Sequence, residues 1–192
     1  MINRFKYWRR IFLAYIVNKG KSNLSFWHGT PEINKNATYD KLGQYYMPFS
    51  YKANYEGNFD KSGIPKLDYQ GNIGPQHNPI AISQWTLGHY NLWCETDDKE
   101  NYSKFIKGSD WLVDNLNLNS NNVYVWHHYF DWNYKETLVN PWYSGLAQGQ
   151  GISVLVRAYQ ISQNQKYLES AKKAYQSFLI DTSQGGVTFT DK

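Results

Sequence analysis

A stretch rich in glycine and glutamine lies in the C-terminal half of the chain and reads Pro141-Trp142-Tyr143-Ser144-Gly145-Leu146-Ala147-Gln148-Gly149-Gln150-Gly151-Ile152-Ser153. We predict a helix that begins near Ser144 and ends near Ser162. Glycine costs a helix interior about 1 kcal/mol relative to alanine. Three glycines within seven residues are therefore expected where backbones approach closely or where a ligand lies at the helix start.

Apolar residues at helical spacing predict further helices on both sides of this stretch. One is expected over residues 165–180. Two earlier helices are also expected. The first covers residues 79–93 and is capped by Asn78, and the second begins after Asp97-Asp98 and ends at the polar loop 115–122. The two helix–turn–helix units lie about 65 to 69 residues apart, which indicates a repeated helical array.

The fold class that follows is mainly α, an incomplete (α/α) toroid or a solenoid built from two α-hairpins. Two hairpins cannot close a ring, so the last one should expose apolar surface. Short strands and loops are expected over residues 22–76, where glycine, asparagine, proline and tyrosine are frequent. A strand or extended segment is expected over residues 123–130, and a turn at Asp131-Trp132-Asn133.

The charge divides the chain of 192 residues into two parts. Residues 1–21 hold six of the 20 basic residues and no acid, whereas residues 22–192 are nearly neutral. We interpret residues 1–21 as a basic arm, with a signal segment or an anchor as alternatives. The neutral body argues against a nucleic-acid-binding protein, and the longest apolar run, seven residues, is too short to span a membrane. A cytoplasmic location is favoured.

The composition also points to a class of ligand. Tyrosine and tryptophan account for 25 residues, and their flat apolar faces with polar tips suit sugar rings as well as protein cores. One cysteine, Cys94, excludes an internal disulfide, and no spacing of Cys and His resembles a zinc site. We expect the adjacent pair His127-His128 to be structural.

Candidate substrate-binding residues come from the same helical stretch. Tyr143, Gln150 and Arg157 are spaced by seven residues and would share one helix face. An arginine fork can bind a carboxylate with two parallel hydrogen bonds, so these residues could hold an acidic sugar. The alternative is that Arg157 pairs with a structural acid or caps a neighbouring helix. Two further candidates are Gln148 and Asp131. The amide of Gln148 needs hydrogen-bond partners if it is buried, and Asp131 could instead close a turn.

Three strings of residues resemble the D-glucuronyl C5-epimerase family, over roughly residues 40–192. They are Tyr45-Tyr46-Met47-Pro48-Phe49, Asn78-Pro79-Ile80-Ala81-Ile82-Ser83-Gln84-Trp85, and the stretch from Trp142 to Ser153 followed by Val156-Arg157-Ala158-Tyr159. The resemblance implies an (α/α)-toroid domain and an isomerase that converts glucuronate to iduronate in heparan- or heparosan-type polysaccharide. It also implies a two-base mechanism at sugar carbon 5, which does not require a metal. We expect no cofactor and assign no metal-binding residues.

The resemblance places the family's acid and base residues downstream of the segment equivalent to Gly185-Gly186-Val187. The chain stops at Lys192, so none of them carries over, and we expect the chain to be inactive alone. Two other classes stay open: a non-catalytic carbohydrate-binding module, and another (α/α)-toroid enzyme such as a uronate lyase or a glycosidase. The expected partners are a uronate-containing polysaccharide and, over the last hairpin, a continuation of the chain or a second copy.

Overall fold

A computed structural model describes residues 32–38, 41–69, 71–133 and 136–190, together with Phe5, Trp8, Arg9, Phe12 and Ile16. Apart from these five positions, the basic arm expected over residues 1–21 lies outside the described residues. None of the described helices combines the length and the apolar character that a membrane span requires.

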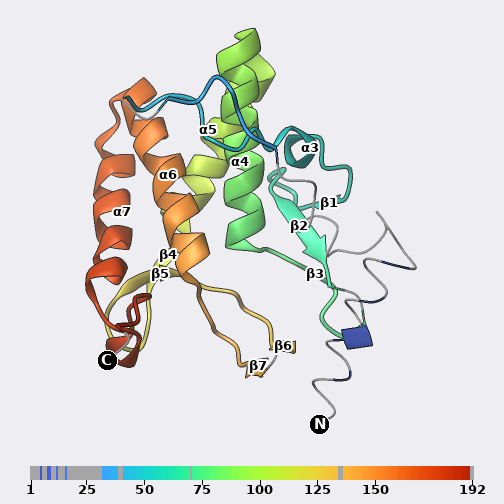
Figure 1. Ribbon diagram of the computed structural model, residues 1–192, viewed down its shortest axis with the longest axis vertical. Coiled ribbons are helices and arrows are strands. Elements are labelled where there is room, and N and C mark those ends of the chain that lie inside the picture. Colours follow the sequence, from blue (N-terminus) through green and yellow to red (C-terminus); the bar gives the residue numbers. More distant parts are fainter. Residues whose placement is uncertain are drawn as a thin grey trace.

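The helices pair into two hairpins: α4 (Pro79–Thr96) with α5 (Lys99–Asp114), and α6 (Gly145–Ser162) with α7 (Gln165–Tyr175). Figure 1 shows α6 and α7 side by side, with α4 next to them in the centre of the molecule. The four helices predicted from the sequence are thus confirmed. The last one is shorter than predicted, because the chain tightens after Tyr175 into the 3-10 helix η2 (Gln176–Leu179).

Each of the four hairpin helices begins at a side chain that accepts hydrogen bonds from the first free N–H groups of the helix. The caps are Asn78 and Asp98 in the first hairpin, and Ser144 and Asn164 in the second. Asn78 and Ser144 lie 66 residues apart, as do Asp98 and Asn164. The left-handed residues that end α4 and α6, Asp97 and Gln163, keep the same offset. The two hairpins therefore repeat one local design.

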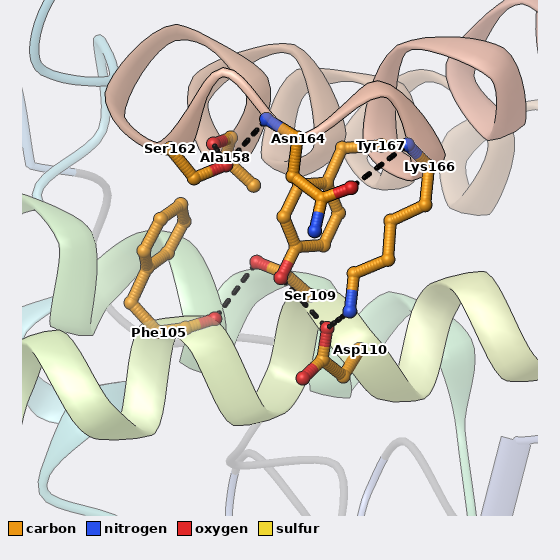
Figure 2. A network of polar contacts seen from close by, with 8 residues as sticks. All are labelled: Phe105, Ser109, Asp110, Ala158, Ser162, Asn164, Lys166 and Tyr167. Atoms are coloured by element: carbon orange, nitrogen blue, oxygen red, sulfur yellow. Dashed lines mark hydrogen bonds and ion pairs between the residues drawn. The ribbon is translucent and has the colours of Figure 1, made fainter.

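The main core lies between the two hairpins and includes Leu87, Phe105, Leu112, Trp126 and Leu155. Almost every residue in the first three turns of α4 is buried, which makes α4 the central helix. A polar cluster joins the hairpins at their edge (Figure 2). There, Asp110 on α5 accepts a hydrogen bond from the Tyr167 hydroxyl at 2.7 Å and pairs with the Lys166 ammonium at 2.7 Å.

The strands are short and surround the helices. Antiparallel β1, β2 and β3 form one sheet next to α4, and two further pairs are β4 with β5 and β6 with β7. Their bounds, with those of the short helices α3 and η3, are α3 Ser50–Ala53, β1 Asn58–Phe59, β2 Pro65–Asp68, β3 Pro75–Gln76, β4 Leu116–Leu118, β5 Tyr124–Trp126, β6 Trp132–Asn133, β7 Thr137–Leu138 and η3 Thr182–Gln184.

These strands narrow one prediction and correct two. The extended segment expected over residues 123–130 is a strand only at β5. The loop expected over residues 115–122 contains β4, which pairs with β5, and the turn expected at Asp131-Trp132-Asn133 contains β6. About half of the described chain is helical, so the mainly α class is confirmed. The incomplete (α/α)-toroid arrangement stays a prediction.

Candidate functional site

Three of the predicted site residues, Gln148, Gln150 and Arg157, are buried on α6, and Gln150 and Arg157 share one face of it. Arg157 is 8% exposed, and its guanidinium lies over the rings of Tyr45 at 5.3 Å and Tyr90 at 5.6 Å. Its Nε donates to the Gly43 carbonyl at 2.9 Å and its Nη1 to the Ser153 carbonyl at 2.9 Å. Aromatic faces and carbonyl oxygens thus surround this cation.

No carboxylate among the described residues forms an ion pair with Arg157. Within the described part of the chain, Arg157 therefore does not pair with a structural acid, which was the alternative interpretation. Burial lowers the pKa of Arg157, and the neighbouring Tyr90 and Tyr45 oppose that effect. An arginine stays protonated at neutral pH even so. The guanidinium is a buried positive charge that still has three N–H groups beyond the two described bonds.

The Gln150 amide belongs to a buried chain of polar groups. Gln150 Oε1 accepts a hydrogen bond from Gln84 Nε2 at 3.1 Å, and Gln84 Oε1 accepts one from the Lys52 ammonium. Gln84 and Gln150 occupy equivalent positions of the two hairpins, 66 residues apart. Burial raises the pKa of the adjacent Tyr45 hydroxyl, Tyr46 adds to the rise, and the Gln150 amide and Arg157 oppose it.

A segment at residues 42–48 covers this face of α6. Asn91 on α4 accepts from the Tyr45 N–H at 2.7 Å and donates to the carbonyls of Met47 and Pro48 at 3.0 and 3.2 Å. Gln160 donates to the Leu42 carbonyl at 3.0 Å, next to the bond that Arg157 makes to Gly43. Both hairpins therefore hold the segment that brings Tyr45 and Tyr46 to the site.

Tyr143 and Asp131 lie away from Arg157 in the structure. Tyr143 precedes the cap of α6, and Arg157 lies in the fourth turn of that helix, about 18 Å along its axis from the first residue. The Tyr143 hydroxyl donates to the Gly185 carbonyl at 3.0 Å. Asp131 is exposed, and its Oδ1 accepts from the Asn140 N–H at 2.8 Å, beyond the β6–β7 pair. The spacing of seven thus unites Gln150 and Arg157 but not Tyr143.

Gln148 is fully buried, and hydrogen bonds within the protein occupy its amide. Its Oε1 accepts from the Trp126 N–H at 3.0 Å. Its Nε2 contacts the carbonyls of Tyr124 and Ala174 and the Ser177 hydroxyl, at 3.1 to 3.3 Å. In this structure Gln148 joins β5 to α7 and η2.

The adjacent histidines are also buried. The His128 ring stacks on Trp142 at 3.7 Å, and burial lowers the pKa of His128 to about 3. The His127 ring meets Tyr143 edge to face at 6.1 Å. The described residues contain no group of three or more His, Cys, Asp or Glu side chains able to hold a metal ion.

Sequence reasoning missed Lys52, Gln84 and Tyr90 as neighbours of the site. Nothing local marks Lys52, because it meets Gln84 only through folding, 32 residues away. The offset of 66 residues between the hairpins would have pointed to Gln84, since it places Gln84 opposite Gln150.

Comparison with known proteins bears on the C-terminal half. Residues 120–192 match the family model described as D-glucuronyl C5-epimerase C-terminus. A D-glucuronyl C5-epimerase of Caenorhabditis elegans is 42% identical over 96 residues, which are 48% of this chain and 15% of that protein. The chain therefore spans a small part of this relative's length. Over residues 120–192, the match confirms the resemblance to the D-glucuronyl C5-epimerase family that the sequence predicts.

Proposed function

We propose that this chain belongs to an enzyme that epimerises glucuronate to iduronate at carbon 5 in heparan- or heparosan-type polysaccharide. In this proposal the two hairpins form a wall of its binding site, and Arg157 holds a uronate carboxylate. The family match over residues 120–192 supports the reaction class. The single observation that carries the site is the buried Arg157 guanidinium, with no acid partner among the described residues.

The chemistry around Arg157 suits a carboxylate. The N–H groups that make no hydrogen bond among the described residues lie on its terminal nitrogens, since Nε is bonded to the Gly43 carbonyl. Two nitrogens of one guanidinium can bind both oxygens of a carboxylate. Tyr46 is 52% exposed beside the buried Tyr45, and its ring could contact the C–H face of a sugar.

The proton at carbon 5 is poorly acidic, so its removal needs donors that stabilise the enolate as well as a base. Arg157 would supply positive charge at the carboxylate. Every tyrosine of the described chain with a displaced pKa has it raised, by burial first of all: Tyr45, Tyr55, Tyr90 and Tyr167. A raised pKa disfavours the phenolate, so these tyrosines are unsuited as bases at neutral pH. We therefore expect the chain to bind a uronate oligomer without exchanging its carbon-5 proton.

Calorimetry on the full chain, with a heparosan oligosaccharide and its carboxyl-reduced form, tests the proposal. We expect Arg157→Lys to weaken binding of the uronate form about tenfold or more, because lysine cannot make the bidentate contact. The control variant Lys172→Met removes a cation from the exposed surface of α7, where Lys172 pairs with Glu169, and should leave affinity within about twofold. Equal affinity of wild type and Arg157→Lys would remove Arg157 from the site.

The chemical step has its own test. Incubation of the oligosaccharide with the full chain in deuterium oxide should leave carbon 5 unlabelled, as followed by mass spectrometry. Label at carbon 5 would contradict our expectation that the acid and base lie outside the described residues. Binding of neither oligosaccharide would contradict the assignment of the wall itself.

A further inference from the structure

A buried lysine is connected to the proposed carboxylate site through two amides. Lys52 on α3 is 4% exposed, and its ammonium donates to Gln84 Oε1 on α4. Gln84 Nε2 in turn donates to Gln150 Oε1 on α6. This series of hydrogen bonds crosses three helices and ends beside the Tyr45 hydroxyl. Both the Gln150 amide and Arg157 act to lower the pKa of that hydroxyl.

The donor-to-acceptor direction of these hydrogen bonds is fixed at one end only, by Lys52. An ammonium has three donors and no acceptor, so the atom of Gln84 that faces Lys52 must be the oxygen. The amide nitrogen of Gln84 then faces Gln150 and requires an oxygen there. The amide nitrogen of Gln150 is left on the side of Tyr45. The Tyr45 hydroxyl at the other end can both donate and accept, so it is compatible with either orientation of the Gln150 amide and fixes neither.

We propose that Lys52 is a positioning residue that, through Gln84, turns the NH2 group of Gln150 toward Tyr45 and so makes the site selective for anionic sugars. With this orientation, the groups nearest a bound carboxylate are the Arg157 guanidinium and an amide donor. With the reverse orientation, the Gln150 carbonyl oxygen would face the carboxylate and repel it. The uronate ligand in this inference rests on the proposed function. The orientation of the two amides does not depend on that function.

The structure also explains why the site needs such a device. An amide is nearly symmetric in shape, so packing alone does not distinguish its oxygen from its nitrogen. A buried polar network keeps one orientation only when a group of fixed donor or acceptor character terminates it. Burial lowers the pKa of Lys52 to about 8, which leaves the ammonium form dominant at neutral pH.

The first test concerns the amides and needs no ligand. In nitrogen-15 NMR spectra of the full chain, Gln84→Glu and Gln150→Glu assign the two side-chain signals by their loss. We expect Lys52→Met to shift the Gln150 NH2 signal and Lys52→Arg to restore it, because arginine is also donor-only. The control Lys172→Met removes the same charge from the exposed surface of α7, where Lys172 pairs with Glu169, and should leave the signal in place. An unchanged Gln150 signal in Lys52→Met overturns the inference.

The second test measures selectivity, as the ratio of affinities for the uronate oligosaccharide and its carboxyl-reduced form. We expect Lys52→Met to lower this ratio about tenfold and Lys52→Arg to recover it to within about threefold. General loss of structure would weaken both ligands and leave the ratio unchanged, and that result would count against positioning. If Lys52→Met does not fold, Gln84→Glu replaces it, because a glutamate still accepts from Lys52 but cannot donate to Gln150.

The two tests separate this inference from the proposed function. If wild type shows no preference for the uronate form, the proposed function fails, whatever the NMR spectra show. If wild type shows the preference and Lys52→Met keeps it, the proposed function survives and the role of Lys52 is overturned.

Discussion

Two glycines of α6 differ in what a methyl group would meet. A Cβ at Gly151 would lie 2.5 Å from Cζ3 of the buried Trp126, whereas the nearest atom at Gly149 is Cζ of Phe178 at 3.8 Å. We expect Gly151→Ala to lower the free energy of unfolding by about 1–3 kcal/mol through overpacking. Gly149→Ala should raise it by about 0.5–1 kcal/mol through helix propensity. Urea unfolding of both variants checks the pair, and a neutral Gly151→Ala would contradict the close approach.

The same residues show how far sequence reasoning reached at this scale. The stretch predicted that glycines mark a close approach and that the glutamine amides need partners. It did not reveal which glycine meets another chain segment, or that Gln148 bonds to β5 while Gln150 bonds to Gln84. Those partners lie 22 and 66 residues away, so they depend on the packing of the helices and not on the local pattern.

At the scale of elements, the helices were predictable because their signals are local. Asn78, Asp98, Ser144 and Asn164 cap helices within three residues of themselves. The strands were less predictable because a pair of two or three residues depends on its partner. Leu116–Leu118 became β4 by pairing with Tyr124–Trp126, in a segment whose asparagines indicated a loop.

The contact between the hairpins in Figure 2 leads to a prediction for these elements. The Tyr167 hydroxyl donates to Asp110 from a buried ring, whereas the Lys166 ammonium pairs with the same carboxylate while 43% exposed. We expect Tyr167→Phe to lower the free energy of unfolding by about 1–2 kcal/mol, because it removes a hydrogen bond to a charged group. Lys166→Ala should cost about 0–1 kcal/mol, as exposed ion pairs do.

Urea unfolding of both single variants and of the double variant measures these energies. A larger loss for Lys166→Ala than for Tyr167→Phe would contradict the order. Burial and the adjacent Asp110 also raise the pKa of Tyr167. The phenol therefore keeps its proton, and the effect of Tyr167→Phe should be the same at pH 7 and pH 9.

For the whole molecule, the repeat of the hairpins determines where the site forms. The equivalent glutamines, Gln84 and Gln150, meet where α4 and α6 pack together. The equivalent residues Asn91 and Arg157, again 66 positions apart, hold one segment over that contact. The surface of the second hairpin and the residues after it also exposes Tyr175, Leu179 and Phe189, in agreement with the apolar surface expected there. A site at the junction of repeats depends on both of them.

Two buried histidines, His89 and His128, contribute to the pH dependence of the stability of the whole molecule. Burial lowers the pKa of His89 to about 4 and that of His128 to about 3, against about 6.5 in the unfolded chain. Below pH 6.5 the unfolded state therefore binds protons that the folded state does not, so stability falls as pH falls. The loss continues down to about pH 4 for His89 and pH 3 for His128. Between pH 7 and pH 5 each histidine should cost about 2 kcal/mol.

His128→Phe isolates one of these contributions. A phenyl ring can keep the stacking on Trp142, and the His128 Nε2 that it replaces has no hydrogen-bond partner among the described residues. We expect the variant to lose about 2 kcal/mol less than wild type between pH 7 and pH 5 in urea unfolding, since it has one titrating group fewer. Parallel pH profiles of variant and wild type would show that His128 is protonated in the folded protein, and would contradict its burial as a neutral ring.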